Sequence, residues 1–214
     1  IEKGRKDKAK PLILYLHGYN QNIRYFETKM KLMMGIQAYH LFVQAPYPIY
    51  DKTRKKKVSE WGRAWYLYDG TQKQFIHSLE KASSFLEKII QQVLKEVNPS
   101  KVCVVGYSMG GYLGGYFALS RPDIVDELVV IGARIKTEAF KENELKKAGH
   151  MKILALHGSR DTSVLPDPQE NCIEKLQQQG VDAEFIVLDK KHRLDDGYIK
   201  PLKKWLIQKN DYSE

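Results

Sequence analysis

The sequence has little cysteine and no long apolar segment. Its 214 residues include two cysteines, Cys103 and Cys172, which lack metal-ligand spacing and do not suggest a disulfide framework. No run of 18 or more apolar residues occurs, so nothing in the chain is expected to span a membrane. No secretory signal is visible either. We therefore expect a reducing compartment, either the cytosol or the mitochondrial matrix.

Internal repeats, low-complexity tracts and domain boundaries are also missing. With 43% hydrophobic residues, the chain can bury one sizeable core. We expect a basic, flexible N-terminal segment at residues 1–10, a single domain over residues 11–209 and a C-terminal tail at residues 210–214. The chain begins with Ile1 rather than Met, so we expect that residues upstream were removed or left out.

Positive charge is in excess. Thirty-five Lys and Arg residues against 26 Asp and Glu residues give a net charge of +9. The clusters are EKGRKDKAK at residues 2–10 and KTRKKK at residues 52–57, which contains Arg54, Lys55, Lys56 and Lys57. Such runs can mark nucleic-acid or anionic membrane surfaces. Neither cluster has a nucleic-acid-binding motif beside it, so solvated loops are the preferred interpretation, with weak contact to an anionic surface as the alternative.

Continuous apolar runs alternate along the chain with segments of helical periodicity. Strands that are apolar throughout belong to a sheet with both faces covered. The pattern therefore predicts a three-layer α/β/α sandwich with a mainly parallel sheet of about six strands. The strands are expected at residues 11–18, 40–46, 101–106, 125–133, 152–158 and 183–189, and the helices at residues 23–36, 71–97, 109–120, 136–149, 167–180 and 195–209.

A serine stands between glycines directly after an apolar run, in the stretch GYSMG at residues 106–110. In the pattern G-x-S-x-G the chain turns so sharply from strand to helix that the serine takes a strained backbone conformation. The turn lifts the serine hydroxyl above a helix N-terminus, whose free N–H groups favour an anion. Ser108 is therefore the candidate nucleophile, and a glycine-rich turn with a capping serine is the alternative.

A nucleophilic serine needs a base and an orienting acid, expected after strand ends in the order Ser, Asp or Glu, His. His192 lies in the loop between the last strand and the last helix, whereas His157 closes a strand and is expected to be a packing or turn residue. Asp161 follows a strand end, and Asp189 is too close to its strand and to His192 to be preferred. Ser108, Asp161 and His192 form the predicted catalytic triad.

An oxyanion formed at Ser108 would need two backbone N–H donors. One is expected from Met109, directly after the nucleophile. The other is expected from the stretch HGYNQN after the first strand, at Tyr19, because Gly18 lets this loop pass close to the site.

The sequence resembles the α/β-hydrolase superfamily, in particular the FSH serine hydrolases and the phospholipase/carboxylesterase group that includes acyl-protein thioesterases. The matching stretches are LYLHGYNQN, FETKM, QAP, RAWY, GYSMGGYLGGYFAL, HGSRDTSV and the histidine at position 192. The resemblance implies a minimal α/β-hydrolase fold that hydrolyses carboxylic esters or thioesters without metal or cofactor. One departure is Lys191, which stands where many relatives have glycine before the catalytic histidine.

A long irregular stretch, residues 46–70, should overlie Ser108 because it follows a strand end. Its aromatics could line an acyl-binding groove, with Tyr47, Trp65 and Tyr66 as the substrate-binding candidates. Ordinary packing of the loop onto the sheet is the alternative. At this length no large lid domain is expected, which favours medium acyl chains or acylated surfaces as substrates.

The leading hypothesis is thus a serine esterase or thioesterase acting on a small-molecule or lipid-like acyl ester, with an acylated protein as a further candidate substrate. The rival hypothesis is a hydrolase-fold subunit with a structural or binding role in a larger assembly. A complete triad argues against the rival, because a retired site usually loses members. Nucleic acid is not the expected partner.

Overall fold

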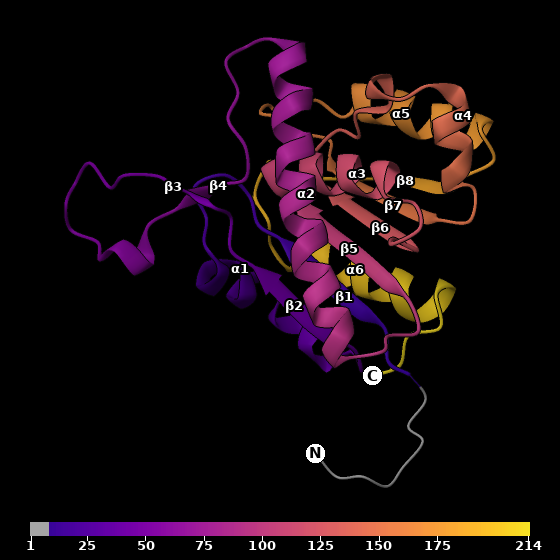
Figure 1. The fold of residues 1–214 in the computed structure, drawn as a ribbon, viewed down its shortest axis with the longest axis horizontal. Coiled ribbons are helices and arrows are strands. Elements are labelled where there is room, and N and C mark those ends of the chain that lie inside the picture. The colour runs from indigo at the N-terminus through magenta and orange to yellow at the C-terminus, as the bar shows by residue number, and fades with distance from the viewer. Residues whose placement is uncertain (1–8) are drawn as a thin grey trace, which may run out of the picture.

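A parallel sheet organises the molecule. The structure is a computed structural model that describes residues 9–214, so most of the predicted N-terminal segment lies outside the described residues. Within this range six parallel strands form the main sheet, in the order β2-β1-β5-β6-β7-β8 (Figure 1). They are β1 (Leu12–Leu16), β2 (Tyr39–Val43), β5 (Val102–Tyr107), β6 (Glu127–Ile131), β7 (Lys152–Gly158) and β8 (Asp182–Leu188). The predicted fold class is confirmed.

The strand order reverses between β1 and β5. From β1 the chain moves outward to β2, and from β5 it moves the other way through β6 to β8. Leu16 at the end of β1 pairs with Gly106 near the end of β5, so the loops after these two strands leave the sheet side by side. Such a reversal leaves a crevice at the carboxyl ends of the strands, where open α/β sheets bind their ligands.

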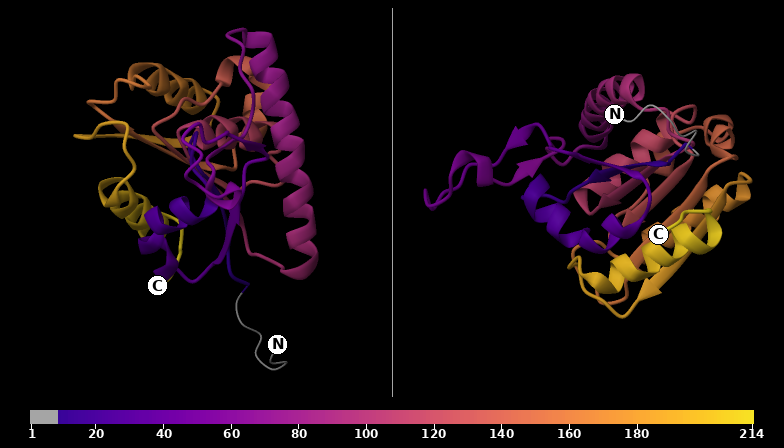
Figure 2. Two further views of the ribbon diagram at one scale, coloured as in Figure 1. Left: turned by 90° about the vertical axis from the view of Figure 1, so that its left-hand side faces the viewer. Right: turned by 90° about the horizontal axis from the view of Figure 1, so that it is seen from below.

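Helices cover both faces of the sheet and give it two hydrophobic cores. On one face lie α2 (Gln72–Glu96), α3 (Met109–Ser120), α4 (Glu142–Leu145) and α5 (Asp167–Gln178), and on the other lie α1 (Ile23–Lys29) and α6 (Asp196–Lys209) (Figures 1 and 2). Successive strand residues serve opposite cores. Leu14 faces the α2 side, whereas Ile13 and Tyr15 face the α1 side. Because alternate residues of a strand point to opposite faces and both faces are buried, odd and even positions are both apolar. This accounts for the continuous apolar runs in the sequence.

Two predicted helices are shorter than the sequence pattern indicated. The helix expected over residues 23–36 ends at Lys29 and continues as a tighter turn over Lys31–Gly35, which still buries Met33. The segment expected to be helical over residues 136–149 holds only α4 and two short turns. It packs onto the sheet through single residues such as Leu145 and Ala148, so no continuous apolar face extends the helix.

Residues 47–64 form a projecting hairpin, called the arm below. Its base is the antiparallel pair β3 (Tyr47–Pro48) and β4 (Arg63–Ala64). The loop between these strands extends away from the body of the molecule in two perpendicular views (Figures 1 and 2). The long irregular stretch of the sequence is therefore a hairpin whose base lies beside the sheet.

The last residues pack against the domain rather than extending from it as the tail that we expected. The Tyr212 hydroxyl donates a hydrogen bond to the buried Glu127 carboxylate at 2.6 Å, and the backbone N–H of Gln37 donates to the Ser213 carbonyl at 2.8 Å. We propose that the single domain includes these residues. Cys103 and Cys172 are both free and buried. None of the helices within residues 9–214 is long and apolar enough to cross a bilayer.

Candidate active site

Ser108 occupies a strained turn between β5 and α3. Its backbone has φ 51° and ψ −119°, in the left-handed region that a residue with a side chain rarely adopts. A side chain at position 106 would overlap the Gly110 carbonyl, and one at position 110 would overlap the Leu16 carbonyl on β1. The two glycines thus allow the strand, the turn and the helix to lie in direct contact, which exposes the serine hydroxyl at the sheet edge.

The structure brings Ser108, His192 and Asp161 together in one hydrogen-bonded row. The Ser108 Oγ lies 2.8 Å from His192 Nε2, and His192 Nδ1 lies 2.6 Å from Asp161 Oδ2. The three side chains come from the loops after β5, β8 and β7, all at the carboxyl edge of the sheet. An imidazole that donates from Nδ1 to a carboxylate leaves Nε2 free to accept the serine proton.

Asp161 is fixed on its far side as well. Its Oδ1 accepts hydrogen bonds from the backbone amides of Ser163 and Val164, both at 2.9 Å, and its side chain is fully buried. The carboxylate therefore turns its other oxygen toward His192. Asp189, the rejected alternative, has a side chain that is 82% exposed and pairs with Arg160.

Tyr107 packs against the His192 ring. The sequence pattern does not mark it as a site residue. The two rings stack with centroids 5.4 Å apart, and the Tyr107 hydroxyl donates to the His192 carbonyl at 3.3 Å. Burial raises the pKa of Tyr107 to about 12, so the phenol keeps its proton. Its position directly before Ser108 is the only signal in the sequence that could have indicated this contact.

Gly132, directly after β6, lies beside the His192 ring and the Asp161 carboxylate. Its φ is +56°, and a Cβ there would lie 3.3 Å from His192 Nδ1 and 3.6 Å from Asp161 Oδ2. A side chain would therefore be strained and would press on the hydrogen bond between the base and the acid.

His157 lies behind the acid as a packing residue. Its Nε2 donates to the Val164 carbonyl at 2.8 Å and lies 3.6 Å from Asp161 Oδ2. Burial lowers the pKa of His157, which favours the neutral ring. It therefore steadies the loop that holds Asp161 and does not compete with His192 for Ser108.

Tyr19 and Met109, the expected oxyanion donors, both line the same cavity as Ser108. Among residues 9–214 the backbone amides of these two residues donate to no protein acceptor, whereas the neighbouring Gly18 and Asn20 amides are engaged. Two unengaged N–H groups beside a nucleophile can bind an oxyanion. Tyr19 as a whole residue is 61% exposed.

His17, a residue that the sequence pattern does not mark, supports this loop from the end of β1. Its Nδ1 donates to the Gly18 carbonyl at 2.8 Å, and its Nε2 accepts from the Ala45 amide at 3.3 Å. Burial lowers the pKa of His17 to about 4, so the ring stays neutral at pH 7. A histidine between a buried strand and a glycine is a signal that could have been read.

Trp65, one of the three substrate-binding candidates, does not line the cavity beside Ser108. It is completely buried, and its indole N–H donates to the His17 carbonyl at 2.7 Å while its ring packs 4.9 Å from the His17 ring. It therefore lies under the loop that carries Tyr19 and cannot contact a substrate. A buried indole needs an acceptor for its N–H, and the end of β1 supplies one.

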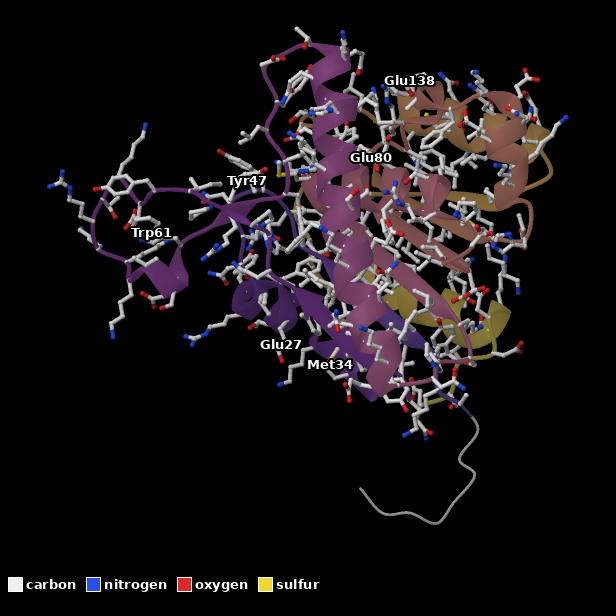
Figure 3. All side chains as sticks on the ribbon, viewed as in Figure 1. Glu27, Met34, Tyr47, Trp61, Glu80 and Glu138 are labelled. Atoms are coloured by element: carbon white, nitrogen blue, oxygen red, sulfur yellow. The ribbon has the colours of Figure 1, made fainter. Side chains whose placement is uncertain are left out.

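The other two substrate-binding candidates, Tyr47 and Tyr66, do line a cavity beside Ser108. The cavity has a volume of about 500 Å³ and lies between the base of the arm, the loop after β1 and the start of α3. The ring centroid of Phe75 on α2 lies 5.1 Å from that of Tyr66, 5.1 Å from that of Tyr68 and 6.0 Å from that of Tyr112. The three tyrosines therefore form one aromatic wall around Phe75. Figure 3 shows Tyr47 where the arm meets the body.

Tyr112 was missed, although it stands one helical turn after Ser108 and thus on the same side of α3. Leu67 and Tyr68 were also missed, because exposed residues in an irregular stretch have no periodicity to mark them. Among the described residues no group of three or more His, Cys, Asp or Glu side chains is placed to hold a metal ion.

Comparisons of the sequence identify a family and a relative. The model of a family described as "Serine hydrolase (FSH1)" matches residues 7–194. The chain is also similar to lysophospholipase-like protein 1 of Mus musculus, with 27% identity over 139 residues that cover 63% of this chain. The match spans 58% of the length of that relative.

Comparisons of the fold give the same architecture. Arabidopsis thaliana SOBER1 superposes with a TM-score of 0.72 at 22% identity, covering 94% of this chain and 99% of that one. Zea mays acyl-protein thioesterase 2 superposes with a TM-score of 0.69 at 16% identity, covering 96% of each chain. At these identities the likeness concerns the fold alone.

Proposed function

Because the chain belongs to the serine hydrolase (FSH1) family, we propose that it cleaves carboxylic esters or thioesters through an acyl-enzyme intermediate on Ser108. The observation that carries this proposal is the row of hydrogen bonds from Ser108 Oγ to His192 Nε2 at 2.8 Å and from His192 Nδ1 to Asp161 Oδ2 at 2.6 Å. It joins a nucleophile, a base and an orienting acid beside a cavity.

In the first half of the reaction Ser108 Oγ attacks the acyl carbon while His192 Nε2 takes the hydroxyl proton. The amides of Tyr19 and Met109 stabilise the tetrahedral oxyanion. As this intermediate collapses, the bond to the alcohol or thiol breaks, His192 returns the proton to the leaving group, and the acyl group stays on Ser108. Asp161 stabilises the imidazolium and keeps its tautomer.

In the second half a water molecule takes the place of the leaving group. His192 removes a proton from the water, whose oxygen attacks the acyl carbon, and a second tetrahedral intermediate forms at the same two amides. The bond to Ser108 then breaks, His192 returns the proton to Ser108 Oγ, and the carboxylic acid leaves. All the groups that hold or move a proton are side chains of this chain.

We propose that the cavity holds the acyl chain. Its aromatic wall, with Tyr66 and Tyr112, and the apolar side chains of Ile49 and Met109 suit a hydrocarbon tail better than a polar leaving group. The mouth carries Leu67 and Tyr68, which are 57% and 62% exposed. A lysophospholipid or an acylated protein would each present such a tail, in line with the names of the mouse relative and the maize thioesterase.

A fluorophosphonate probe is expected to label the folded protein with one adduct on Ser108. The activated hydroxyl attacks phosphorus as it would an acyl carbon, and the product is a stable ester. Intact-mass spectrometry and peptide mapping give the adduct and its position. The Ser108→Ala variant is expected to stay unlabelled. A folded wild-type protein that takes up no probe would contradict the proposal and favour a structural or binding role.

Medium-chain esters are expected to be hydrolysed ten- to a hundredfold faster than acetate, as kcat/KM for p-nitrophenyl octanoate against p-nitrophenyl acetate. Each buried methylene contributes about 0.8 kcal/mol, and only part of the added chain is shielded in an open cavity. Leu67→Ser at the mouth is expected to lower this ratio. Val187→Ser on β8, where Val187 is 48% exposed, is the matched control and is expected to leave it unchanged. A preference for acetate would contradict an acyl-binding cavity.

A further inference from the structure

The loop of the arm folds so that its acids bind backbone amides. The Asp51 carboxylate accepts hydrogen bonds from the amides of Thr53, Lys55 and Lys56 and from the Thr53 hydroxyl. The hydrogen bonds from the Lys56 amide and the Thr53 hydroxyl lower the pKa of Asp51. Glu60 accepts from the Lys57 amide at 3.0 Å. Both acids therefore order the loop instead of pairing with its cations.

The cations of the same loop remain on the outside. They are Lys52, Arg54, Lys55, Lys56 and Lys57, and none of them forms an ion pair within residues 9–214. Figure 3 shows nitrogen-tipped side chains pointing away from the arm into solvent. Five positive charges against two acids give a net charge of +3 over residues 51–60.

A small aromatic core supports this arrangement. Tyr50 and Trp61 meet edge to face at 5.2 Å, the Arg54 Nε donates to the Tyr50 hydroxyl at 3.1 Å, and the Trp61 indole N–H donates to the Lys56 carbonyl at 3.2 Å. Asn22 ties the loop to the body through a hydrogen bond to the Glu60 carbonyl. The charges are thus presented by a folded element and not by a loose run.

The arm is continuous with the mouth of the acyl cavity. Its base supplies Tyr47, Pro48, Ile49 and Ala64 to the cavity lining. Exposed apolar side chains lie on the loop and around the mouth, namely Tyr19, Tyr50, Val58, Leu67 and Tyr68, each at least 55% exposed. Tyrosine rings with one apolar and one polar end suit the boundary between water and lipid headgroups.

We propose that the arm docks on an anionic lipid bilayer and thereby sets the mouth of the cavity at the membrane surface. The basic loop attracts the surface electrostatically, and the exposed tyrosines, Val58 and Leu67 enter the headgroup region. These apolar side chains favour a bilayer over nucleic acid. A phosphate backbone binds the cations of the loop but provides no apolar surface against which Val58 and Leu67 could be buried. Docking of the arm does not depend on the proposed function. The further step, delivery of a membrane-derived acyl ester to Ser108, rests on it.

The experiment is cosedimentation with vesicles in the Ser108→Ala background, so that binding is measured independently of catalysis. Vesicles of about three parts phosphatidylcholine to one part phosphatidylserine are compared with phosphatidylcholine alone, at low salt and at about 0.5 M salt. The variant Lys55→Gln, Lys56→Gln, Lys57→Gln keeps the backbone hydrogen bonds of the loop. Each basic residue near an anionic surface contributes about fivefold, so this variant is expected to partition about 100-fold more weakly.

The matched control is Lys81→Gln, Lys88→Gln, Lys95→Gln, which removes the same charge from the exposed face of α2. It is expected to change partitioning less than tenfold, and circular dichroism and thermal melting check the fold of both variants. The proposal would be overturned by equal losses in the two triple variants, by equal binding to phosphatidylcholine alone, by no vesicle binding, or by arm-dependent binding to RNA without binding to vesicles. Fluorophosphonate labelling of the wild type tests Ser108 separately.

Discussion

Replacing Ser108 with alanine is expected to lower kcat for ester hydrolysis by about 10⁴- to 10⁶-fold while leaving the fold intact. The hydroxyl is the group that forms the covalent bond, and the cavity and the two amides cannot replace it. A methyl group at this position fits, because Cβ is already accommodated in the strained turn. Single-turnover kinetics with a p-nitrophenyl ester measures the loss. Ser120→Ala at the other end of α3 removes a hydroxyl from the same helix and is expected to leave kcat unchanged.

The loss should not grow when the base is removed as well. His192 acts by taking the proton of Ser108, so the double variant Ser108→Ala, His192→Ala is expected to be no slower than either single variant. Residues that act as one unit give such non-additive losses. Multiplied losses in the double variant would show that the two side chains act independently, and a Ser108→Ala variant within tenfold of wild type would exclude Ser108 as the nucleophile.

The elements with two independent signals could be predicted from the sequence. The helix expected over residues 71–97 is α2 at Gln72–Glu96, because a long apolar repeat ends at Asn98-Pro99, which cannot continue it. Each strand begins and ends within a few residues of the bounds expected from the sequence. A parallel strand that is buried on both faces needs apolar residues at odd and even positions alike, which gives a clear signal. These features are local, so the chain alone determines them.

The segments held by tertiary contacts could not be predicted. The stretch around α4 has charged residues suited to a helix, yet the residues that reach the core, such as Phe140, Leu145 and Ala148, do not form one continuous helical face. Trp65 lies in an irregular stretch, where no periodicity indicates whether its side chain faces the core or the substrate cavity. Its burial depends on the carbonyl of His17, 48 residues earlier in the chain.

The candidate site was predictable where topology dictates it. Strand order places Ser108, Asp161 and His192 at one edge, because carboxyl ends of parallel strands meet there. The supporting side chains were not. Tyr107 and Gly132 act by packing against His192, and packing distances have no signature in a sequence. The folding of the arm around Asp51 was equally hidden, since a run of lysines looks the same whether its loop is ordered or loose.

Replacing Asp161 with asparagine is expected to lower kcat by about 10⁴-fold, the loss typical of this change in a Ser-His-Asp triad. The Oδ1 of Asp161 accepts two backbone amides at 2.9 Å, from Ser163 and Val164, so an asparagine must turn its carbonyl oxygen to that side. Its NH₂ group then faces His192 Nδ1 and donates to it. The imidazole proton moves to Nε2, which can no longer accept the proton of Ser108.

Asp189→Asn is the matched control, because it removes the same charge three residues before His192 from a side chain that is 82% exposed and paired with Arg160. We expect its kcat to stay within about twofold of wild type, since exposed ion pairs contribute little. Fluorophosphonate labelling should slow in parallel with kcat for Asp161→Asn, and thermal melting should show that both variants fold. If Asp161→Asn lost less than tenfold while Asp189→Asn lost more, Asp189 would be the orienting acid.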